Sequence, residues 1–220
     1  MFNLRVGKFN TPLGLWTPAH WAILTETSRK PLHEADKLIP VKQVGMQYFS
    51  TTHGERWDLD YSLYISNGEE ISDTNKLNDR AHGWGADIKY TWDSSLIFGA
   101  SHLSTTHYNT MALYAHYSFL QDRMEAKAEY MDYNEDTILK GDRNPWYIML
   151  KGEPIKGKWL GVRYDAYSDN DSSDEQVTTF FVNIFPISRV VIKAEYNMHD
   201  FSRQSSVDYN EWQLWLGVIL

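Results

Sequence analysis

Alternation of apolar and polar residues is the dominant pattern along the chain. In the stretch WDLDYSLYIS at 57–66, every second residue from Trp57 to Ile65 is apolar and most residues between them are polar. Successive side chains of a β-strand point to opposite faces, so this alternation predicts a strand with one apolar and one polar side. Similar runs predict about twelve strands, at 2–10, 41–50, 57–66, 83–92, 96–105, 110–120, 124–133, 146–152, 158–168, 176–185, 189–201 and 209–220.

The links between these strands alternate in length. The links after even-numbered strands are short (TTHGER, DSS, QDR, EPIKG and PIS), whereas the links after odd-numbered strands are longer and more polar, except at 106–109. Residues 11–40 contain four prolines and no period of two, which predicts a long inserted loop with a helical turn near Ala19 to Thr25. Short turns on one side and long loops on the other are typical of transmembrane β-barrels. We therefore predict one all-β domain over residues 1–220, an antiparallel transmembrane β-barrel.

The apolar sides of the strands carry aromatic residues mostly near the strand ends and aliphatic residues mostly in the middle. This is the distribution of two aromatic girdles around a hydrocarbon belt, so these sides are expected to face lipid. The expected girdle residues are Trp57, Trp84, Tyr90, Trp92, Tyr117, Trp146 and Trp212.

The opposite sides of the strands are rich in charge. On a lipid-facing side each charge would cost roughly 2 to 4 kcal/mol near the bilayer midplane, so these residues are expected to face a watered lumen. The mixture leans acidic, with seven acids against four bases. The expected pore-lining residues are Asp58, Asp60, Asp87, Lys89, Glu125, Lys127, Glu129, Arg163, Asp165, Lys193 and Glu195.

Composition narrows the alternatives. The chain has no Cys, and a formal charge of -8 without a basic run argues against nucleic acid as a partner. Aromatic residues make up 15% of the chain, which fits a membrane interface. Hydropathy shows no stretch of about 18 apolar residues, so no transmembrane helix is predicted. A soluble antiparallel protein whose apolar faces meet in a core stays open as an alternative, because alternation also fits it.

The first residues, MFNLRVGKFN, already form an expected strand and have no signal peptide in front of them. We expect the chain to be a trimmed form or a segment of a longer protein. A protein that stays inside the cell and is not inserted in a membrane stays open as the alternative.

The stretch VGKFNTPLGLW at 6–16, together with 25–49, resembles the phosphate-selective porin family, the porin O and P group. The similar features are Gly7-Lys8-Phe9 at a strand end, the turn Thr11-Pro12-Leu13-Gly14, and Glu26 with Arg29 on a long loop. The last stretch, YNEWQLWLGVIL, is similar to the closing strand of exported barrels, although it ends in Leu220 where Phe is usual. The similarity is specific over the first 50 residues. Beyond them it rests only on the succession of alternating strands and links that is typical of a barrel.

The resemblance implies a sixteen-stranded homotrimer in the bacterial outer membrane, with a loop folded inward to narrow the pore. With about twelve strands, this chain is expected to be the C-terminal part of such a barrel or a shortened copy, and a twelve-stranded barrel that closes by itself stays open as an alternative. Arg29, Lys30 and Lys37 are the constriction candidates, although a solvated loop face is the simpler explanation for them. The family's anion channel depends on basic residues lining the lumen, and the acidic balance here does not favour phosphate.

No catalytic, cofactor or metal site is predicted. The loop DNDSSDE at 169–175 is acidic but lacks the Gly and the distal Glu of a calcium loop. No histidines have metal-ligand spacing, and no G-x-S-x-G motif occurs. The expected partners are outer-membrane lipid, lipopolysaccharide and small solutes or ions. The expected function is passive diffusion of hydrophilic solutes or ions, with anions such as phosphate included by the resemblance. The alternative is a non-conducting structural or adhesive barrel, plugged by inward aromatics such as Tyr64, Tyr114, Phe181 and Phe185.

Overall fold

The computed structural model describes residues 2–19, 25–32, 39–69, 82–135, 143–168, 174–187, 189–202 and 208–218. Twelve strands form a single sheet in which each strand pairs antiparallel with the next one along the sequence. The strands are β1 (Asn3–Asn10), β2 (Lys42–His53), β3 (Trp57–Glu69), β4 (Gly83–Trp92), β5 (Leu96–Thr105), β6 (Tyr108–Phe119), β7 (Met124–Glu135), β8 (Trp146–Ile155), β9 (Lys158–Tyr167), β10 (Glu175–Ile187), β11 (Val190–Phe201) and β12 (Tyr209–Val218). The predicted all-β antiparallel fold is confirmed.

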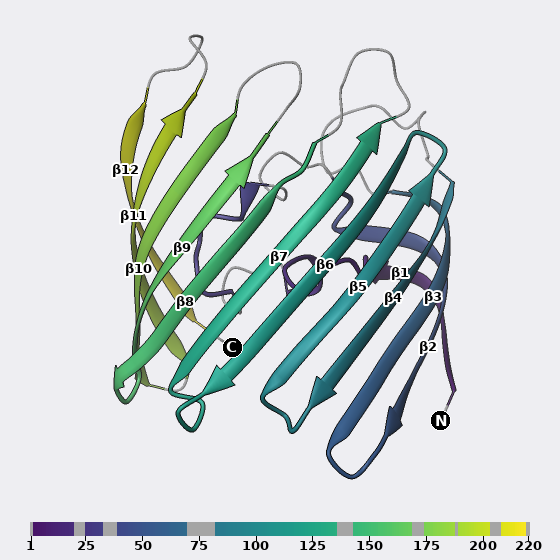
Figure 1. The fold of residues 1–220 in the computed structure, drawn as a ribbon, viewed down its shortest axis with the longest axis horizontal. Helices are drawn as coiled ribbons and strands as arrows, with labels where there is room; N and C mark the ends of the chain where they lie inside the picture. The colour runs from purple at the N-terminus through teal and green to yellow at the C-terminus, as the bar shows by residue number, and fades with distance from the viewer. Residues whose placement is uncertain are drawn as a thin grey trace.

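The sheet is a curved wall of tilted strands (Figure 1). It bends around a concave side, and β1 and β12 lie at its two edges. Among the described strands, β1 pairs only with β2 and β12 only with β11. Tilt and curvature of this kind are those of a barrel wall.

The predicted sorting of link lengths is also confirmed. The links after β2, β4, β6, β8 and β10 are two to four residues long, so they form one short-turn end of the sheet. The strand ends that the longer links join lie at the opposite end of the sheet, where 106–107 is again the short exception. The helical turn expected near Ala19 to Thr25 falls mostly on residues 20–24, which lie outside the described part, and a 3₁₀ helix, η1, spans Thr17–Ala19 just before them. None of the helices in the described part of the chain has the length and apolar character of a membrane-spanning helix.

The two faces of the sheet differ in the way that the alternation predicts. On the convex face, side chains such as Trp84, Leu113 and Ile148 are exposed, by 52%, 45% and 52%. On the concave face, polar and charged side chains such as Arg163 and Lys193 are buried, each with 1% exposure. A soluble sandwich would show the reverse distribution. The exposed apolar face therefore argues against the soluble alternative.

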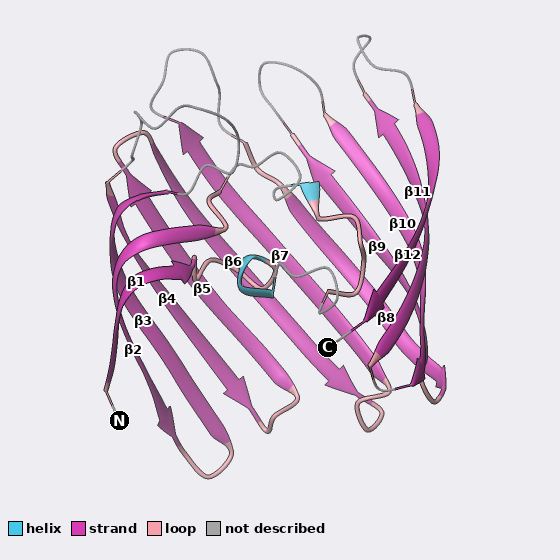
Figure 2. Ribbon diagram, turned by 180° about the vertical axis from the view of Figure 1, so that it is seen from behind, coloured by secondary structure: helices cyan, strands magenta, loops and turns pink. Residues whose placement is uncertain are grey.

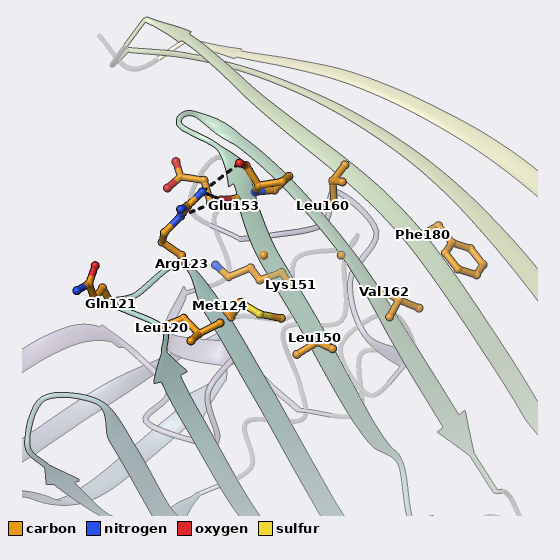
Figure 3. Close-up of a pocket in the computed structure, with 13 residues that line it drawn as sticks. Leu120, Gln121, Arg123, Met124, Leu150, Lys151, Glu153, Leu160, Val162 and Phe180 are labelled. Atoms are coloured by element: carbon orange, nitrogen blue, oxygen red, sulfur yellow. Dashed lines mark hydrogen bonds between the residues drawn. The ribbon is translucent and has the colours of Figure 1, made fainter.

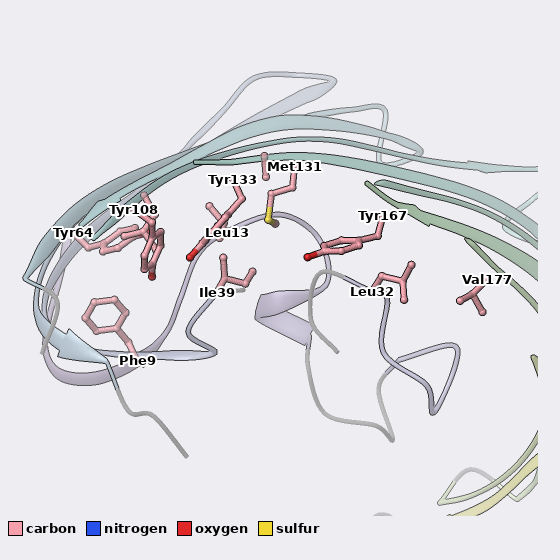
Figure 4. Close-up of a cluster of buried hydrophobic side chains, with 12 residues drawn as sticks. Phe9, Leu13, Leu32, Ile39, Tyr64, Tyr108, Met131, Tyr133, Tyr167 and Val177 are labelled. Carbon is pink, nitrogen blue, oxygen red and sulfur yellow. The ribbon is translucent and has the colours of Figure 1, made fainter. Parts of the chain in front are cut away.

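The segment between β1 and β2 lies on the concave side of the sheet (Figure 2). Its apolar residues Leu13, Leu32 and Ile39, together with Phe9 at the end of β1, are buried against inward side chains of the other strands (Figure 4). The strand residues in this cluster are Tyr64, Leu103, Tyr108, Ala112, Met131, Tyr133, Tyr167 and Val177. The small hydrophobic core of the molecule thus lies inside the curved sheet and fixes the inserted segment there.

Gly14 shows why the start of this segment has its particular sequence. Its φ of +68° is a left-handed conformation that glycine adopts without strain. A Cβ at this position would meet the Glu129 carboxylate, and the Gly14 amide donates to Ser101 Oγ at 3.0 Å. The turn at Thr11–Gly14 therefore needs glycine both for its backbone angle and for its close approach to β7.

Candidate pore lining and inward segment

The eleven charged residues expected to line a pore all lie on the concave face, as their strand positions require. Glu129, Arg163, Asp165, Lys193 and Glu195 are almost fully buried there, with exposures of 1 to 3%. Their burial comes from the inserted segment, which covers them. Residues that the sequence assigned to an open lumen are thus the residues that hold this segment, and their pore-lining role stays a prediction.

Glu26 is the centre of the first group of contacts. Its carboxylate accepts hydrogen bonds from Lys127 Nζ on β7 and from Lys151 Nζ on β8, the latter at 3.2 Å. Lys151 also pairs with Glu125 at 3.0 Å, and Glu125 with His116 at 3.1 Å. Burial alone would raise the pKa of Glu26, but the two lysine charges and the Lys127 hydrogen bond lower it to about 2. Glu26 is therefore ionised at neutral pH.

Arg163 and Glu195 bind the backbone of the same segment. Arg163 Nη1 donates to Thr27 Oγ1 and, at 3.0 Å, to the carbonyl oxygen of Arg29. Glu195 accepts from the amide of Ser28 and, at 3.1 Å, from the amide of Arg29. Arg163 is itself paired with Asp165 at 2.7 Å. A cation and an anion from neighbouring parts of the sheet thus satisfy both donors and acceptors of residues 27–29.

Lys193 and Asn183 complete the binding of the segment from β11 and β10. Lys193 Nζ donates to the carbonyl oxygen of Thr25, and Asn183 Nδ2 donates to that of Glu26 at 2.7 Å. Residues 25–30, which we call the clamped segment, therefore contact side chains of every strand from β7 to β11. Its conformation depends on charged side chains that are far away in the sequence.

The constriction candidates are placed differently from one another. Arg29 Nη1 contacts Glu211 Oε1 on β12 at 3.2 Å, and its Nη2 lies 3.6 Å from Glu175 Oε1 on β10. Lys30 lies at the end of the clamped segment, where its carbonyl oxygen accepts from Arg163 at 3.3 Å. Lys37 lies outside the described residues. The charge of Arg29 is thus offset by two carboxylates, and the constriction role of these residues stays a prediction.

The remaining expected pore residues lie on the concave face of β3 and β4. Asp60 pairs with Lys89 at 2.9 Å. Asp87 accepts hydrogen bonds from Ser101 Oγ at 2.8 Å and from the Tyr114 hydroxyl at 2.9 Å. Asp58, near the short-turn end, contacts His53 at 2.6 Å. Except for Asp87, these groups are more accessible than those beside the clamped segment.

The expected girdle residues lie on the convex face, in two groups. Trp57, Tyr90 and Trp92 stack near the short turns, with ring centroids 6.1 and 6.4 Å apart, and Tyr117 is also near the short-turn end. Near the long links, Trp146 contacts Tyr164 at 5.4 Å and Trp212 contacts Tyr196 at 4.6 Å, and Trp84 lies at the same end of the sheet. The contact of these rings with lipid stays a prediction.

Several residues of the site were missed from the sequence. Lys151, Glu175, His199 and Glu211 take part in the charged contacts, yet none was among the expected residues. Their strand parity could have identified them, since Lys151 alternates with the outward Leu150, and Glu175 shares its side with the buried Val177. The inward aromatics are buried at Tyr64, Tyr114 and Phe181, whereas Phe185 is 41% exposed beside a β-bulge.

Comparison with known proteins shows which solved structures share this fold. No family model matches the sequence, and a search of curated proteins gives no match. The outer-membrane expressed OmpT of Vibrio cholerae is 11% identical, with a TM-score of 0.64 over 91% of this chain and 67% of that one. The outer membrane channel DcaP of Acinetobacter baumannii is 11% identical, with a TM-score of 0.66 over 97% and 70%. An anion-selective porin from Comamonas acidovorans is 13% identical, with a TM-score of 0.65 over 98% and 68%. The twelve-stranded sheet therefore has the fold of outer-membrane β-barrel porins.

Proposed function

We propose that the chain is an outer-membrane porin through which small hydrophilic solutes or ions diffuse passively. The observation that carries this proposal is the distribution of polarity over one curved sheet: an exposed apolar convex face and a charged concave face. Lipid contact accounts for the first face and a water-filled lumen for the second. The clamped segment then narrows the lumen from within.

We propose weak ion selectivity for this channel. The basic side chains nearest to the clamped segment are already paired, as Lys127 and Lys151 are with Glu26 and Glu125. A ring of cations that selects anions needs positive charge in excess along the path. The paired charges support passage of small ions of both signs, and they speak against a phosphate-specific site.

Planar-bilayer recording of the refolded full chain tests the proposal. Discrete conductance steps with a small reversal potential in a salt gradient are the expected result. A protein that inserts into the bilayer but gives no steps would contradict conduction. Such a result would favour the second candidate, a structural or adhesive barrel, which the aromatic filling around Phe9, Tyr64 and Tyr108 favours.

The assembly of the porin belongs to the same proposal. The family resemblance implies a homotrimer, with lipopolysaccharide around the end that carries the long links. Native mass spectrometry of the refolded chain in detergent would show three copies if this is correct. A monomeric mass would contradict the trimer without affecting conduction.

A further inference from the structure

The convex face of the sheet is hollowed at its short-turn end. A groove of about 940 Å³ lies there, within the size range of ligand pockets. Its apolar lining includes Met124 from β7, Leu150 from β8, Leu160 from β9 and Phe180 from β10 (Figure 3). The groove is thus formed by four adjacent strands on the face that we assign to lipid.

Gly152 produces the hollow. In the sheet it lies between Met124 and Leu160, in a row of convex-facing positions. Gly152 is the one residue of this row without a side chain, so the convex surface is recessed there between the side chains of Met124 and Leu160. A Cβ here would meet no atom closer than 3.6 Å, and the backbone is not in the left-handed region. By contrast, a Cβ at Gly45 would meet a backbone oxygen at 1.9 Å. Backbone crowding therefore does not require glycine at position 152.

A cation is fixed at the mouth of the groove. The Arg123 guanidinium donates to the carbonyl oxygen of Glu153 at 2.9 Å and to that of Pro154 at 3.0 Å. These acceptors are neutral, so they orient the positive charge without offsetting it. Within the described residues no carboxylate lies at ion-pair distance from it, and the Glu153 carboxylate accepts from the Gly157 amide at 2.6 Å. The exposed Lys158, on the same face as Leu160, adds a second positive charge.

The corresponding turn between β2 and β3 shows that this arrangement is particular to one place. Arg56 also lies at the short-turn end, but it pairs with Asp93 at 2.8 Å. Its charge is therefore offset. Arg123 combines an available charge with an adjacent apolar groove, and a molecule that is anionic at one end and apolar at the other matches both.

We propose that this groove binds one phospholipid of the leaflet on the short-turn side. One acyl chain lies over Gly152 between Met124 and Leu160, and the phosphate contacts Arg123. The site depends on the convex face being in lipid and not on conduction, so it goes beyond the proposed channel function. Phosphate suits guanidinium because a hydrogen bond between two charged groups is stronger than one between neutral groups.

Lipid retention by the refolded full chain tests the site. The protein is purified in detergent micelles containing phosphatidylglycerol, and bound lipid is counted by native mass spectrometry as the lipid is titrated. We expect one tightly retained phosphatidylglycerol per chain. A diacylglycerol with the same chains should bind at least about tenfold more weakly, since it lacks the charged acceptor.

Two variants with matched controls locate the bound lipid. Gly152→Leu fills the groove and Arg123→Gln removes the charge, and each should weaken retention by about tenfold. Ala86→Leu, on the convex face of β4, and Arg56→Gln, at the paired arginine, should leave it unchanged. If Gly152→Leu does not refold, Gly152→Ala and Arg123→Gln still decide the question.

Three results would overturn the proposal. Equal retention by all variants would mean bulk lipid around the barrel. Equal binding of diacylglycerol would remove the phosphate contact. Loss of the lipid together with formation of a dimer through this face would assign the groove to a second copy of the chain. None of these results depends on whether the protein conducts ions.

Discussion

Glu26 is the residue on which the inward segment most depends. It is the only carboxylate of the clamped segment that the structure shows between two lysines, Lys127 and Lys151. Burying a carboxylate costs free energy unless cations and hydrogen bonds offset that cost. The pKa of about 2 means that the offset is complete and that the ionised form is preferred.

Acid should release the clamped segment. The pKa of Glu26 falls from 4.5 to about 2 on folding, so its stabilisation is fully present above about pH 4.5 and is lost as the pH falls toward 2. At about 1.4 kcal/mol per pKa unit, the contribution is on the order of 3 kcal/mol. The noise of the current recorded from single channels should increase as the pH is lowered through this range. The Glu26→Gln variant should lack that transition, and an identical transition in the variant would assign it to another group.

Removing the Glu26 charge should also change ion preference. In Glu26→Gln at neutral pH, Glu125 is the one carboxylate among the described residues that still pairs with Lys127 and Lys151. The excess positive charge should shift the reversal potential in a potassium chloride gradient toward anions. Glu55→Gln, in the exposed turn between β2 and β3, is the control and should leave the reversal potential unchanged. A shift toward cations would contradict the placement of Glu26 beside the conduction path.

The backbone angles and contact partners of single residues were the features of the structure that the sequence predicted least well. The turn residues Asp93 and Ser94 have φ values of 50° and 56°, and Gln121 has 58°, although none is glycine. Antiparallel strands with very short links need such left-handed turns, whatever residues are present. Likewise, the partners of Glu26 and Arg163 could not be identified, because contacts between a loop and strands more than 100 residues away leave no local pattern.

At the scale of the strand, the alternation assigns each position to a face. Ile88 and Asp87 are neighbours on β4 that point to opposite sides. Ile88 is 49% exposed on the convex face, whereas Asp87 accepts hydrogen bonds from Ser101 and Tyr114 on the concave face. Substitutions at these two positions therefore test sensitively which face of the sheet each side chain occupies.

Ile88→Arg should prevent assembly in membranes. A charge in the lipid-facing wall costs roughly 2 to 4 kcal/mol near the midplane. We expect little or no heat-modifiable folded form on gels after refolding into lipid vesicles. Ile88→Leu should refold normally, and Asp87→Asn should refold with at most a small change in ion preference. Equal loss of folding in Ile88→Arg and Asp87→Asn would refute the assignment of the two faces.

Strands were predictable because their period is local. Short runs that are bounded by turn residues, such as 83–92 and 96–105, have the same bounds in the structure as in the sequence interpretation. Where polar residues continue a strand, the observed strand is longer than the predicted one. β2 extends to His53 and β3 to Glu69, because hydrogen bonds to the neighbouring strand continue there. The residues of DNDSSDE at 169–173 lie outside the described part.

At the scale of the whole molecule, the chain crosses its own interior. The segment after β1 is bound by strands from β7 to β12, so the beginning and the end of the chain are joined through the lumen. Alternation predicted the wall but not this connection. Only the family resemblance suggested an inward loop, and the contacts that hold it follow from the curvature of the sheet.

Arg163 is the side chain through which this connection is best tested. It is 1% exposed, it joins β9 to Thr27 and Arg29, and it pairs with Asp165 on the same strand. Arg163→Gln removes the charge and leaves Asp165 buried without its cation, a change that typically costs about 3 to 5 kcal/mol. The sheet itself keeps its ladder hydrogen bonds, so the barrel should still assemble.

The expected result is a barrel whose lumen is wider and fluctuates more in width. Single-channel conductance of Arg163→Gln should be higher than that of the wild type, with more rapid fluctuations, because the clamped segment is no longer fixed on β9. Arg163→Lys keeps the charge but not the forked geometry, so it should give an intermediate conductance. Unchanged conductance in a folded Arg163→Gln barrel would mean that the segment does not border the path of the ions.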